Sequence, residues 1–284
     1  MESRHRSVWA NAAAAWRVDP MLVDVDYALG CLLSQWTQEP GARGLRFKGG
    51  TCLRKCYFFD YRFSEDLDFT GVEGIGVERV KRLAQGIIRR VRDVFGLDLA
   101  AAPPLVKSMV EEDEEVSIEA RLYYRGPLRR TGDPRAIRLH ISSQEHLAFP
   151  PTVRSVMHPY EDALFALSST VVCCDLREVL AEKVRAISGR RKHAISLDLY
   201  DLHWLLTRGG LSLSEVDRVL RVKFEAKGLR IGSVSAREFR ERMAEFERDW
   251  SQNLSYLVPY TMAIRFEDAW ATAVRVVEHV AGSA

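Results

Sequence analysis

Residues 45–70 read LRFKGGTCLRKCYFFDYRFSEDLDFT, and this stretch decides the fold of the first half of the chain. Its pattern predicts a short strand at Leu45-Arg46-Phe47, a turn at Lys48-Gly49-Gly50, and a helix from a Thr51 cap through about Tyr57. Alternating polar and apolar residues predict a second strand from Phe63 to Thr70. The stretch therefore predicts a strand, turn and helix followed by another strand, which is typical of an α+β domain.

Asp66 and Asp68 lie two residues apart on the second predicted strand, so both carboxylates point to one face. Hard divalent cations such as Mg²⁺ commonly bind one or two carboxylates together with substrate phosphates. Gly49-Gly50-Thr51 stands between a strand and a helix, where backbone N–H groups and the helix dipole favour a phosphate. Each feature alone also fits an ordinary structural role, as an exposed strand face or a tight turn. Together they favour a metal and nucleotide site.

The rest of the chain extends this pattern in both directions. The first 40 residues have apolar positions at helical spacing, and Val77 to Phe95 predicts a further helix. Val116 to Tyr124 and Ala136 to Ser142 predict the two strands of a hairpin. Beyond about Val153 the pattern is helical almost to the end. Its strongest helical stretches are 176–187, 197–206, 234–254 and 266–280.

Composition narrows the class of protein. The 284 residues, 47% of them hydrophobic, can fill a sizeable core, which excludes a mainly disordered chain. The formal net charge of +2 does not indicate whether the chain binds nucleic acid. Five cysteines without a CxxC pair predict neither a disulfide framework nor a zinc site. No signal-peptide pattern and no membrane-length apolar run is present, so we expect a cytoplasmic protein without a membrane partner.

Lys183 falls at the centre of the apolar face of the predicted helix 176–187. A buried ammonium group needs a carboxylate partner, a path to water, or an anion such as a triphosphate. Asp198 and Asp201 lie on the next predicted helix, which is apolar almost all round, so these acids also need partners. Two compatible interpretations stay open: an ion pair that joins the two helices, and a set of charges that borders an active site.

Four segments form a recognisable pattern when they are taken in order. They are FKGGTCLRK at 47–55, YRFSEDLDF at 61–69, LAEKVRA at 180–186 and DLYDL at 198–202. Their combination resembles the AbiEii/AbiGii-type nucleotidyltransferase toxin family of bacterial toxin-antitoxin systems, a branch of the polymerase-β-like nucleotidyltransferases. The resemblance implies an α+β fold with a nucleotidyltransferase core of mixed sheet and N-terminal helices at residues 1–155. A mostly helical domain at 156–284 is then expected to contribute Lys183 and Asp198 to the cleft.

The resemblance also implies an activity. It implies an Mg²⁺-dependent transfer of a nucleoside monophosphate from an NTP to RNA, in studied members to the 3′ end of tRNA, with release of pyrophosphate. This transfer would block translation and growth until a cognate antitoxin neutralises the toxin, and Mn²⁺ is the alternative cofactor. Two other interpretations stay open: the acceptor is a protein or small molecule, or the chain is a catalytically inactive module that binds nucleotide or antitoxin.

Residue roles carry over from the resemblance position by position. Asp66 and Asp68 would bind the metal, Lys183 would neutralise phosphate charge, and Asp198 would be the distal acid of the last motif. The implied nucleotide-binding residues are Lys48, Gly49, Gly50, Thr51, Ser64 and Asp201, of which Asp201 is also the second choice for the distal acid.

One position departs from the superfamily pattern. A third carboxylate is usual on a later strand, and His140 stands in that place. An imidazole can ligate a metal or accept the hydroxyl proton, although it is a poorer Mg²⁺ ligand than a carboxylate. His140 is therefore a candidate catalytic residue; the alternatives are a plain strand histidine and a third acid from elsewhere, with Glu145 the nearest candidate.

Ser64 shares the face of the two strand acids. Phosphorylation of Ser64 would place negative charge beside the nucleotide site, and we predict that it blocks triphosphate or metal binding. The alternative is that Ser64 is a small residue needed for tight packing.

Two basic clusters are candidates for contact with the RNA backbone. The first comprises Arg185, Arg190, Arg191, Lys192 and His193, and the second comprises Arg125, Arg129, Arg130, Arg135 and Arg138. Arginine-rich loops are also common as solvated surface, so neither cluster alone predicts RNA binding.

Overall fold

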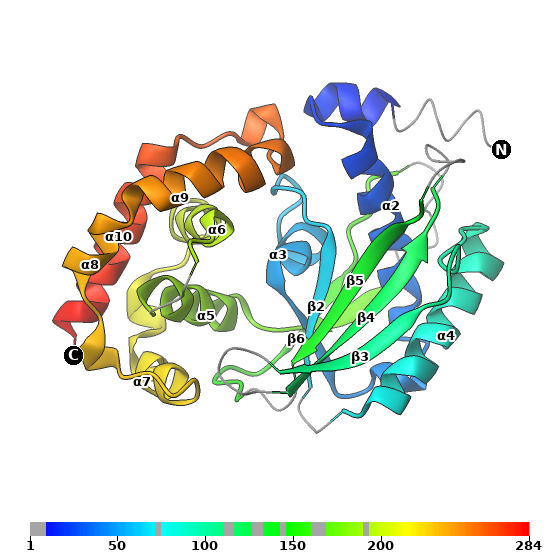
Figure 1. Ribbon diagram of the computed structural model, residues 1–284, viewed down its shortest axis with the longest axis horizontal. Coiled ribbons are helices and arrows are strands. Elements are labelled where there is room, and N and C mark those ends of the chain that lie inside the picture. The colour runs from blue at the N-terminus through cyan, green and yellow to red at the C-terminus, as the bar shows by residue number, and fades with distance from the viewer. Residues whose placement is uncertain are drawn as a thin grey trace. The chain divides into compact units, whose positions relative to one another are not determined.

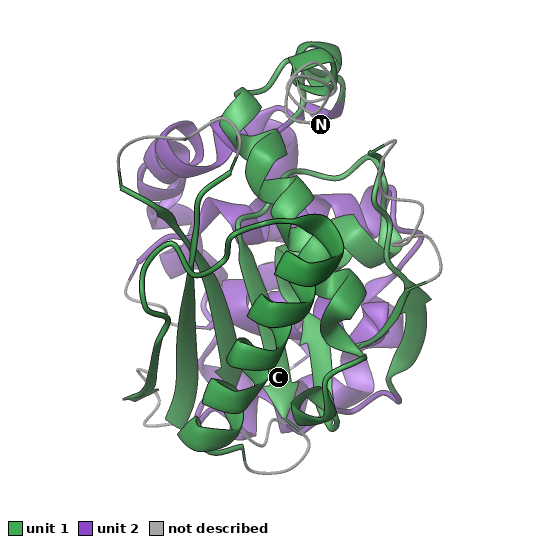
Figure 2. Cartoon of the chain, turned by 90° about the vertical axis from the view of Figure 1, so that its right-hand side faces the viewer, with its two compact units in different colours: residues 1–145, 151–174, 259–261 green, residues 146–150, 175–258, 262–284 purple. Residues whose placement is uncertain are grey.

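The computed structural model describes residues 10–71, 75–110, 116–126, 133–142, 146–160, 169–189 and 193–283. The chain forms two compact units, which Figure 2 shows in different colours. Unit 1 comprises residues 1–145, 151–174 and 259–261, and unit 2 comprises 146–150, 175–258 and 262–284. The sequence predicts a domain boundary after residue 155. The compact units divide instead after Cys174, because the strand that ends at Cys173 belongs to the sheet of unit 1.

Unit 1 is built on a seven-stranded mixed sheet in the order β3-β4-β5-β2-β1-β7-β6. Figure 1 labels β2, β3, β4, β5 and β6 of this sheet. Its strands are β1 (Leu45–Lys48), β2 (Asp66–Gly71), β3 (Leu105–Val110), β4 (Val116–Tyr124), β5 (Arg135–Ser142), β6 (Thr152–Ser155) and β7 (Thr170–Cys173). β2 runs parallel to β5, β1 runs parallel to β7, and the other neighbours are antiparallel. The predicted α+β class and the β4–β5 hairpin are confirmed.

Helices α2 (Pro20–Trp36) and α4 (Val77–Phe95) pack against this sheet. α2 begins where the Asp19 carboxylate accepts a hydrogen bond from the Met21 N–H at 2.8 Å. Trp36, at its other end, stacks on Phe69 of β2 with ring centroids 3.9 Å apart. Because Phe69 faces this helical layer, the alternation of the strand turns Asp66 and Asp68 to the opposite face.

Three strands were not predicted by the sequence. The region beyond Val153 was expected to be helical, and this is wrong for β7 and for the end of β6. β7 has only four residues, and its pairing partner, Phe47 of β1, is distant in the chain. β3 and β6 are edge strands with mostly exposed side chains, so they lack the apolar alternation by which a strand is recognised.

The strand that carries the acids begins at Asp66 and not at Phe63. Arg54 Nη1 donates a hydrogen bond to the Tyr61 carbonyl at 2.5 Å, and Arg62 Nη1 donates to the Phe63 carbonyl at 3.1 Å. These carbonyl groups are therefore bound by arginine side chains, and ladder pairing starts only after them.

Unit 2 is helical within its described residues. Its helices are α5 (Leu176–Ser188), α6 (Ser196–Thr207), α7 (Asp217–Glu225), α8 (Ala236–Glu241), α9 (Met243–Asp249) and α10 (Phe266–Gly282). α10 packs on α5 and α6, and the predicted stretch 234–254 is broken at Arg242 between α8 and α9. The described part of the chain contains no helix with the length and apolar content that a membrane crossing requires.

The described residues also form several short helical segments. They are η1 (Pro40–Ala42), α3 (Gly49–Cys52), the π-helix η2 (Leu53–Tyr57), η4 (Leu213–Glu215), η5 (Ile231–Ser233), the π-helix η6 (Trp250–Leu254), η7 (Ser255–Leu257) and η8 (Tyr260–Met262). α3 and η2 are continuous, so one helical segment leads away from the glycine turn.

Candidate active site

The glycine turn lies directly against the strand that carries the two acids. β1 pairs with β2 so that Lys48 stands opposite Asp68. Gly49 follows with φ +80°, and a Cβ atom built on it would lie 2.3 Å from Asp68 Oδ2. Only glycine combines this left-handed backbone with so close an approach to a carboxylate. The two sequence motifs, the glycine turn and the paired acids, therefore form one site.

Replacing Gly49 by alanine is expected to lower the nucleotidyl transfer that the motif resemblance implies by roughly 10²-fold. The new Cβ would push the Asp68 carboxylate out of place, and a displacement of about 1 Å at a reacting centre can cost that much. Strain at φ +80° should also lower the free energy of unfolding. Initial rates and urea unfolding of the purified variant check both effects.

The matched control is Gly76→Ala at the start of α4, where a Cβ would meet nothing within 4 Å among the described residues. Its rate should equal that of the wild type. Equal rates for Gly49→Ala and the wild type would show that the close approach has no catalytic importance.

A buried arginine lies beside the second glycine. A Cβ on Gly50 would lie 2.6 Å from Arg62 Nη2, and the Arg62 side chain is buried. Its guanidinium adds positive charge beside the turn, where a phosphate is also favoured by the start of the helical segment. Arg62 has no role among the sequence predictions; the available signal was an arginine two residues before Ser64 in the acid motif.

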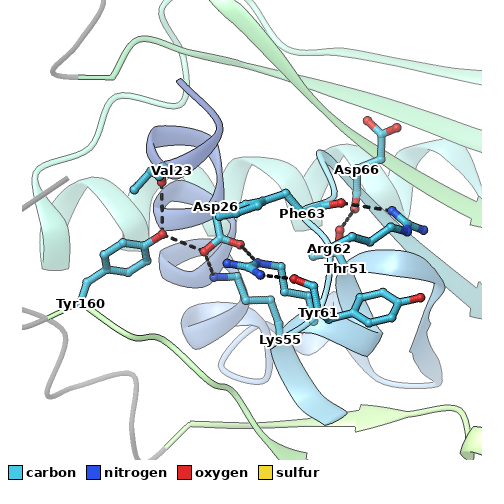
Figure 3. Close-up of polar contacts among 10 residues, drawn as sticks. Val23, Asp26, Thr51, Lys55, Tyr61, Arg62, Phe63, Asp66 and Tyr160 are labelled. Atoms are coloured by element: carbon cyan, nitrogen blue, oxygen red, sulfur yellow. Dashed lines mark hydrogen bonds and ion pairs between the residues drawn. The ribbon is translucent and has the colours of Figure 1, made fainter. Parts of the chain in front are cut away.

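Thr51 has a different local role from the one predicted. α3 begins at Gly49, so Thr51 does not cap the helix. Its Oγ1 donates a hydrogen bond to the Asp66 carbonyl at 2.5 Å, as Figure 3 shows. The Thr51 side chain is buried, and this hydrogen bond ties the glycine turn to the first residue of β2.

The register of β2 and β5 gives each acid a neighbour. Asp66 stands beside Arg138, with Nε 3.0 Å from Oδ1, and Asp68 stands beside His140, with Nδ1 3.9 Å from Oδ1. The side chains of Asp66 and Asp68 are 42% and 33% exposed, which leaves both open to a ligand. Two accessible carboxylates suit Mg²⁺, which keeps several waters and phosphate oxygens as further ligands. The donor set therefore fits this cation.

A third acid is present on the neighbouring strand. Glu119 of β4 stands opposite His140, so Glu119, His140 and Asp68 share one face on three consecutive strands. Burial opposes its ionisation, but the hydrogen bond and charge of Arg121 hold the pKa of Glu119 below its ordinary value. No sequence pattern indicated Glu119, because its place depends on the register of two strand pairs. Glu145, the acid that the sequence suggested, lies outside the described residues.

Lys183 binds both acids of the next helix within unit 2. Its Nζ lies 2.6 Å from Asp198 Oδ1 and 2.7 Å from Asp201 Oδ2, and both carboxylates are buried. The predicted ion pair between the two helices, α5 and α6, is thus confirmed. Because two carboxylates share one ammonium group, removal of the lysine would leave two buried negative charges.

Replacing Lys183 by methionine is expected to lower the free energy of unfolding at pH 7 by about 3–5 kcal/mol, the cost of breaking a buried ion pair. The double variant Lys183→Met/Asp201→Asn should recover part of this loss, because it removes one of the unpaired charges. Denaturant unfolding of wild type and both variants measures the two changes. A single variant as stable as the wild type would exclude a structural role for the cluster.

A buried charge network connects α2 with the helical segment that follows the glycine turn (Figure 3). The Asp26 carboxylate of α2 accepts hydrogen bonds from Arg54 Nε at 2.7 Å, Lys55 Nζ at 2.5 Å and Tyr160 Oη at 2.8 Å. Arg54 also binds the Tyr61 carbonyl, so the network connects α2 with the segment that leads into β2. The sequence did not reveal it, because its members come from three distant segments.

The remaining candidates belong to unit 1, to unit 2 or to residues outside the described part of the chain. Ser64 is half-buried just before β2. In the first basic cluster, Arg185 is half-buried on α5, whereas Arg190, Arg191 and Lys192 are outside the described residues. In the second, Arg135 pairs with Glu65, and Arg129 and Arg130 are also outside the described residues.

A mixed sheet with a glycine turn set against paired strand carboxylates is typical of a nucleotidyltransferase. The sequence profile described as "Nucleotidyl transferase AbiEii toxin, Type IV TA system" matches residues 31–272. The chain belongs to this family of toxins, and it is a nucleotidyltransferase. The resemblance inferred from the four sequence motifs is confirmed.

Solved structures have the same fold. MenT4, a nucleotidyltransferase toxin of Mycobacterium tuberculosis, matches with a TM-score of 0.54 and 21% identity over 99% of this chain and 98% of that one. JHP933 from Helicobacter pylori matches with a TM-score of 0.51 and 13% identity over 93% and 94%. At these identities the likenesses show the fold alone. Among proteins with curated descriptions, no sequence matches this chain.

Proposed function

We propose that this toxin transfers a nucleoside monophosphate from an NTP to RNA, with the 3′ end of tRNA as the favoured acceptor. The transfer blocks translation in the cytoplasm. The observation that carries this proposal is the close approach of Gly49 to Asp68, which supports phosphate binding by the turn beside a carboxylate that can hold Mg²⁺. Membership of a toxin-antitoxin family supports an antitoxin as the partner that restrains this activity.

The residues of unit 1 have separate tasks in the proposed reaction. The backbone N–H groups at Gly49 and Gly50 bind phosphate oxygens, and the nearby Lys48 and Arg62 add positive charge. Asp66 and Asp68 hold Mg²⁺, or Mn²⁺ in its place, and the bound cation neutralises charge on the transferring phosphate. A ribose hydroxyl of the acceptor attacks the α-phosphate in line, and pyrophosphate leaves. Positioning of these groups supplies much of the rate.

In the proposed site, His140 of β5 lies between Asp68 and Glu119 on one face of the sheet. Its position beside Asp68 is suitable for a metal ligand or for a group that accepts the hydroxyl proton. Retained activity in His140→Asp, with loss in His140→Ala, would support a role for this position in the reaction, because aspartate restores the carboxylate of the superfamily pattern and can also ligate a metal or accept a proton.

In unit 2, Lys183 is proposed to neutralise phosphate charge with Asp198 as the distal acid, and Asp201 to contribute to nucleotide binding. The motif resemblance supports these roles, and the ion pairs show that the three side chains act as one cluster. Arg185, with Arg190, Arg191 and Lys192, is proposed to contact the RNA backbone.

The test is a labelling assay with purified protein. The protein is incubated with Mg²⁺, one α-labelled NTP at a time and total bacterial tRNA, and Asp66→Ala serves as the inactive control. Label on tRNA that is absent from the Asp66→Ala reaction is the expected result. Label on protein with none on tRNA would move the acceptor to another class, and no label on any acceptor would contradict nucleotidyl transfer to RNA.

A further inference from the structure

Three cysteines that are separated in the sequence meet in the core of unit 1. Cys52 ends α3, Cys56 lies in η2 and Cys173 ends β7. Their Sγ atoms all lie within 4.8 Å of one another, and all three side chains are buried. Within the described residues, this is the only group of three or more His, Cys, Asp or Glu side chains with ligand atoms so close together.

Two features of the fold create this cluster. Cys52 and Cys56 are four residues apart on one helical segment, so they lie on the same side of it. Pairing of β7 with β1 then sets Cys173 beside Phe47, and Cys52 Sγ donates a hydrogen bond to the Phe47 carbonyl at 3.4 Å. The sequence showed no metal-binding spacing, because Cys173 reaches Cys52 and Cys56 only through the pairing of β7 with β1.

The distances agree with a shared cation. Sulfur ligands bind Zn²⁺ at about 2.3 Å, so three sulfurs around one such ion lie about 3.8–4.0 Å apart. Thiols already within 4.8 Å of one another need to converge by about 1 Å at most. Thiolates select soft cations and discriminate against Mg²⁺, so this cluster and the acids of β2 would bind different metals.

The charges around the cluster favour a divalent ion. A divalent cation with three thiolates has a net charge of −1. Asp26, Arg54 and Lys55 form a buried ion-paired group of net charge +1, and Lys55 precedes Cys56 directly in the chain. The ion-paired group and a site of one divalent cation with three thiolates would therefore have opposite net charges.

We propose that Cys52, Cys56 and Cys173 form a binding site for one soft divalent cation of the Zn²⁺ class. Binding releases the three thiol protons, including the one that Cys52 shares with the Phe47 carbonyl. Cys52 directly follows Thr51, which holds Asp66, so the bound cation fixes the helical segment behind the glycine turn to β7. The site is separate from the proposed Mg²⁺ site and does not depend on nucleotidyl transfer.

The experiment is a titration of the reduced, metal-free full-length protein with Cd²⁺, which takes the same sulfur ligands and gives an ultraviolet sulfur-to-metal absorption band. Wild type should bind one equivalent tightly, with Zn²⁺ competing and excess Mg²⁺ having no effect. Cys173→Ser should weaken Cd²⁺ binding by more than about 100-fold, the upper end of the range for outer-shell changes, because it removes a direct ligand. Bound metal should also raise the thermal midpoint of the wild type.

Cys31→Ser and Cys174→Ser are the matched controls, because both residues are buried cysteines outside the cluster. Both variants should bind Cd²⁺ like the wild type. If circular dichroism shows that Cys173→Ser is unfolded, Cys52→Ser takes its place. The absorption band and the stoichiometry of the wild type test the site in either case. No sulfur-to-metal band in the wild type, or equal affinity in the wild type and in a folded cluster variant, would overturn the proposal.

Discussion

Replacing Asp68 by asparagine is expected to lower nucleotidyl transfer by at least about 10³-fold while the protein stays folded. In the proposed role of Asp68, the change would cost the bound cation and with it several kcal/mol of transition-state stabilisation, and each 1.36 kcal/mol corresponds to a factor of ten in rate. Asparagine keeps the size of the side chain, and Asp68 is partly exposed, so the fold should tolerate the change. Steady-state rates with saturating NTP, measured over a series of Mg²⁺ concentrations, are the decisive measurement.

The matched control is Glu65→Gln, which removes one negative charge from the same segment. Glu65 forms an ion pair with Arg135, and it precedes the residues of β2 that pair with β5. Its rate should stay close to that of the wild type. A rate for Asp68→Asn similar to that of the control would mean that Asp68 does not hold the catalytic cation.

Asp26→Asn is expected to lower the free energy of unfolding at pH 7 by about 3–5 kcal/mol, which is a large part of the stability of a typical domain. Burial opposes the charge of Asp26, yet the charges and hydrogen bonds of Arg54 and Lys55 hold its pKa well below its ordinary value of 3.8. The stabilisation is therefore complete above pH 3.8 and is lost only as the pH falls further. With asparagine in this place, two buried cations lose their carboxylate. Urea unfolding at pH 7 measures the effect.

Asp24→Asn provides the comparison on the same helix. Asp24 accepts a hydrogen bond from Tyr124 Oη at 2.8 Å, and burial raises its pKa to about 6. Its charge is thus unfavourable at pH 7, and its removal should change stability by less than about 1 kcal/mol, within the scatter of hydrogen-bond energies. If Asp26→Asn does not express, Tyr160→Phe gives a smaller, graded loss. Equal stability of Asp26→Asn and Asp24→Asn would contradict the importance of the ion-paired network.

Local patterns determined those parts of the site that depend on spacing along the chain. The glycine turn, the face shared by Asp66 and Asp68, and the ion pair of Lys183 with Asp198 and Asp201 follow from the periods of strands and helices. The α+β class, the hairpin and the four motifs that define the family were also readable from the sequence alone. These features depend on residues that are close in sequence, or on the fixed periods of a helix or strand.

The tertiary structure alone decided how distant segments meet. It set Gly49 against Asp68, placed Glu119 in the row with His140, and brought Cys173 to Cys52. It also set the division between the units after Cys174 and not after residue 155, because the four-residue strand β7 pairs with β1. The physical reason is that strand order and register are set by packing and hydrogen bonding across the whole sheet. One sequence shows the period of each strand but does not show which strands from distant parts of the chain lie next to one another.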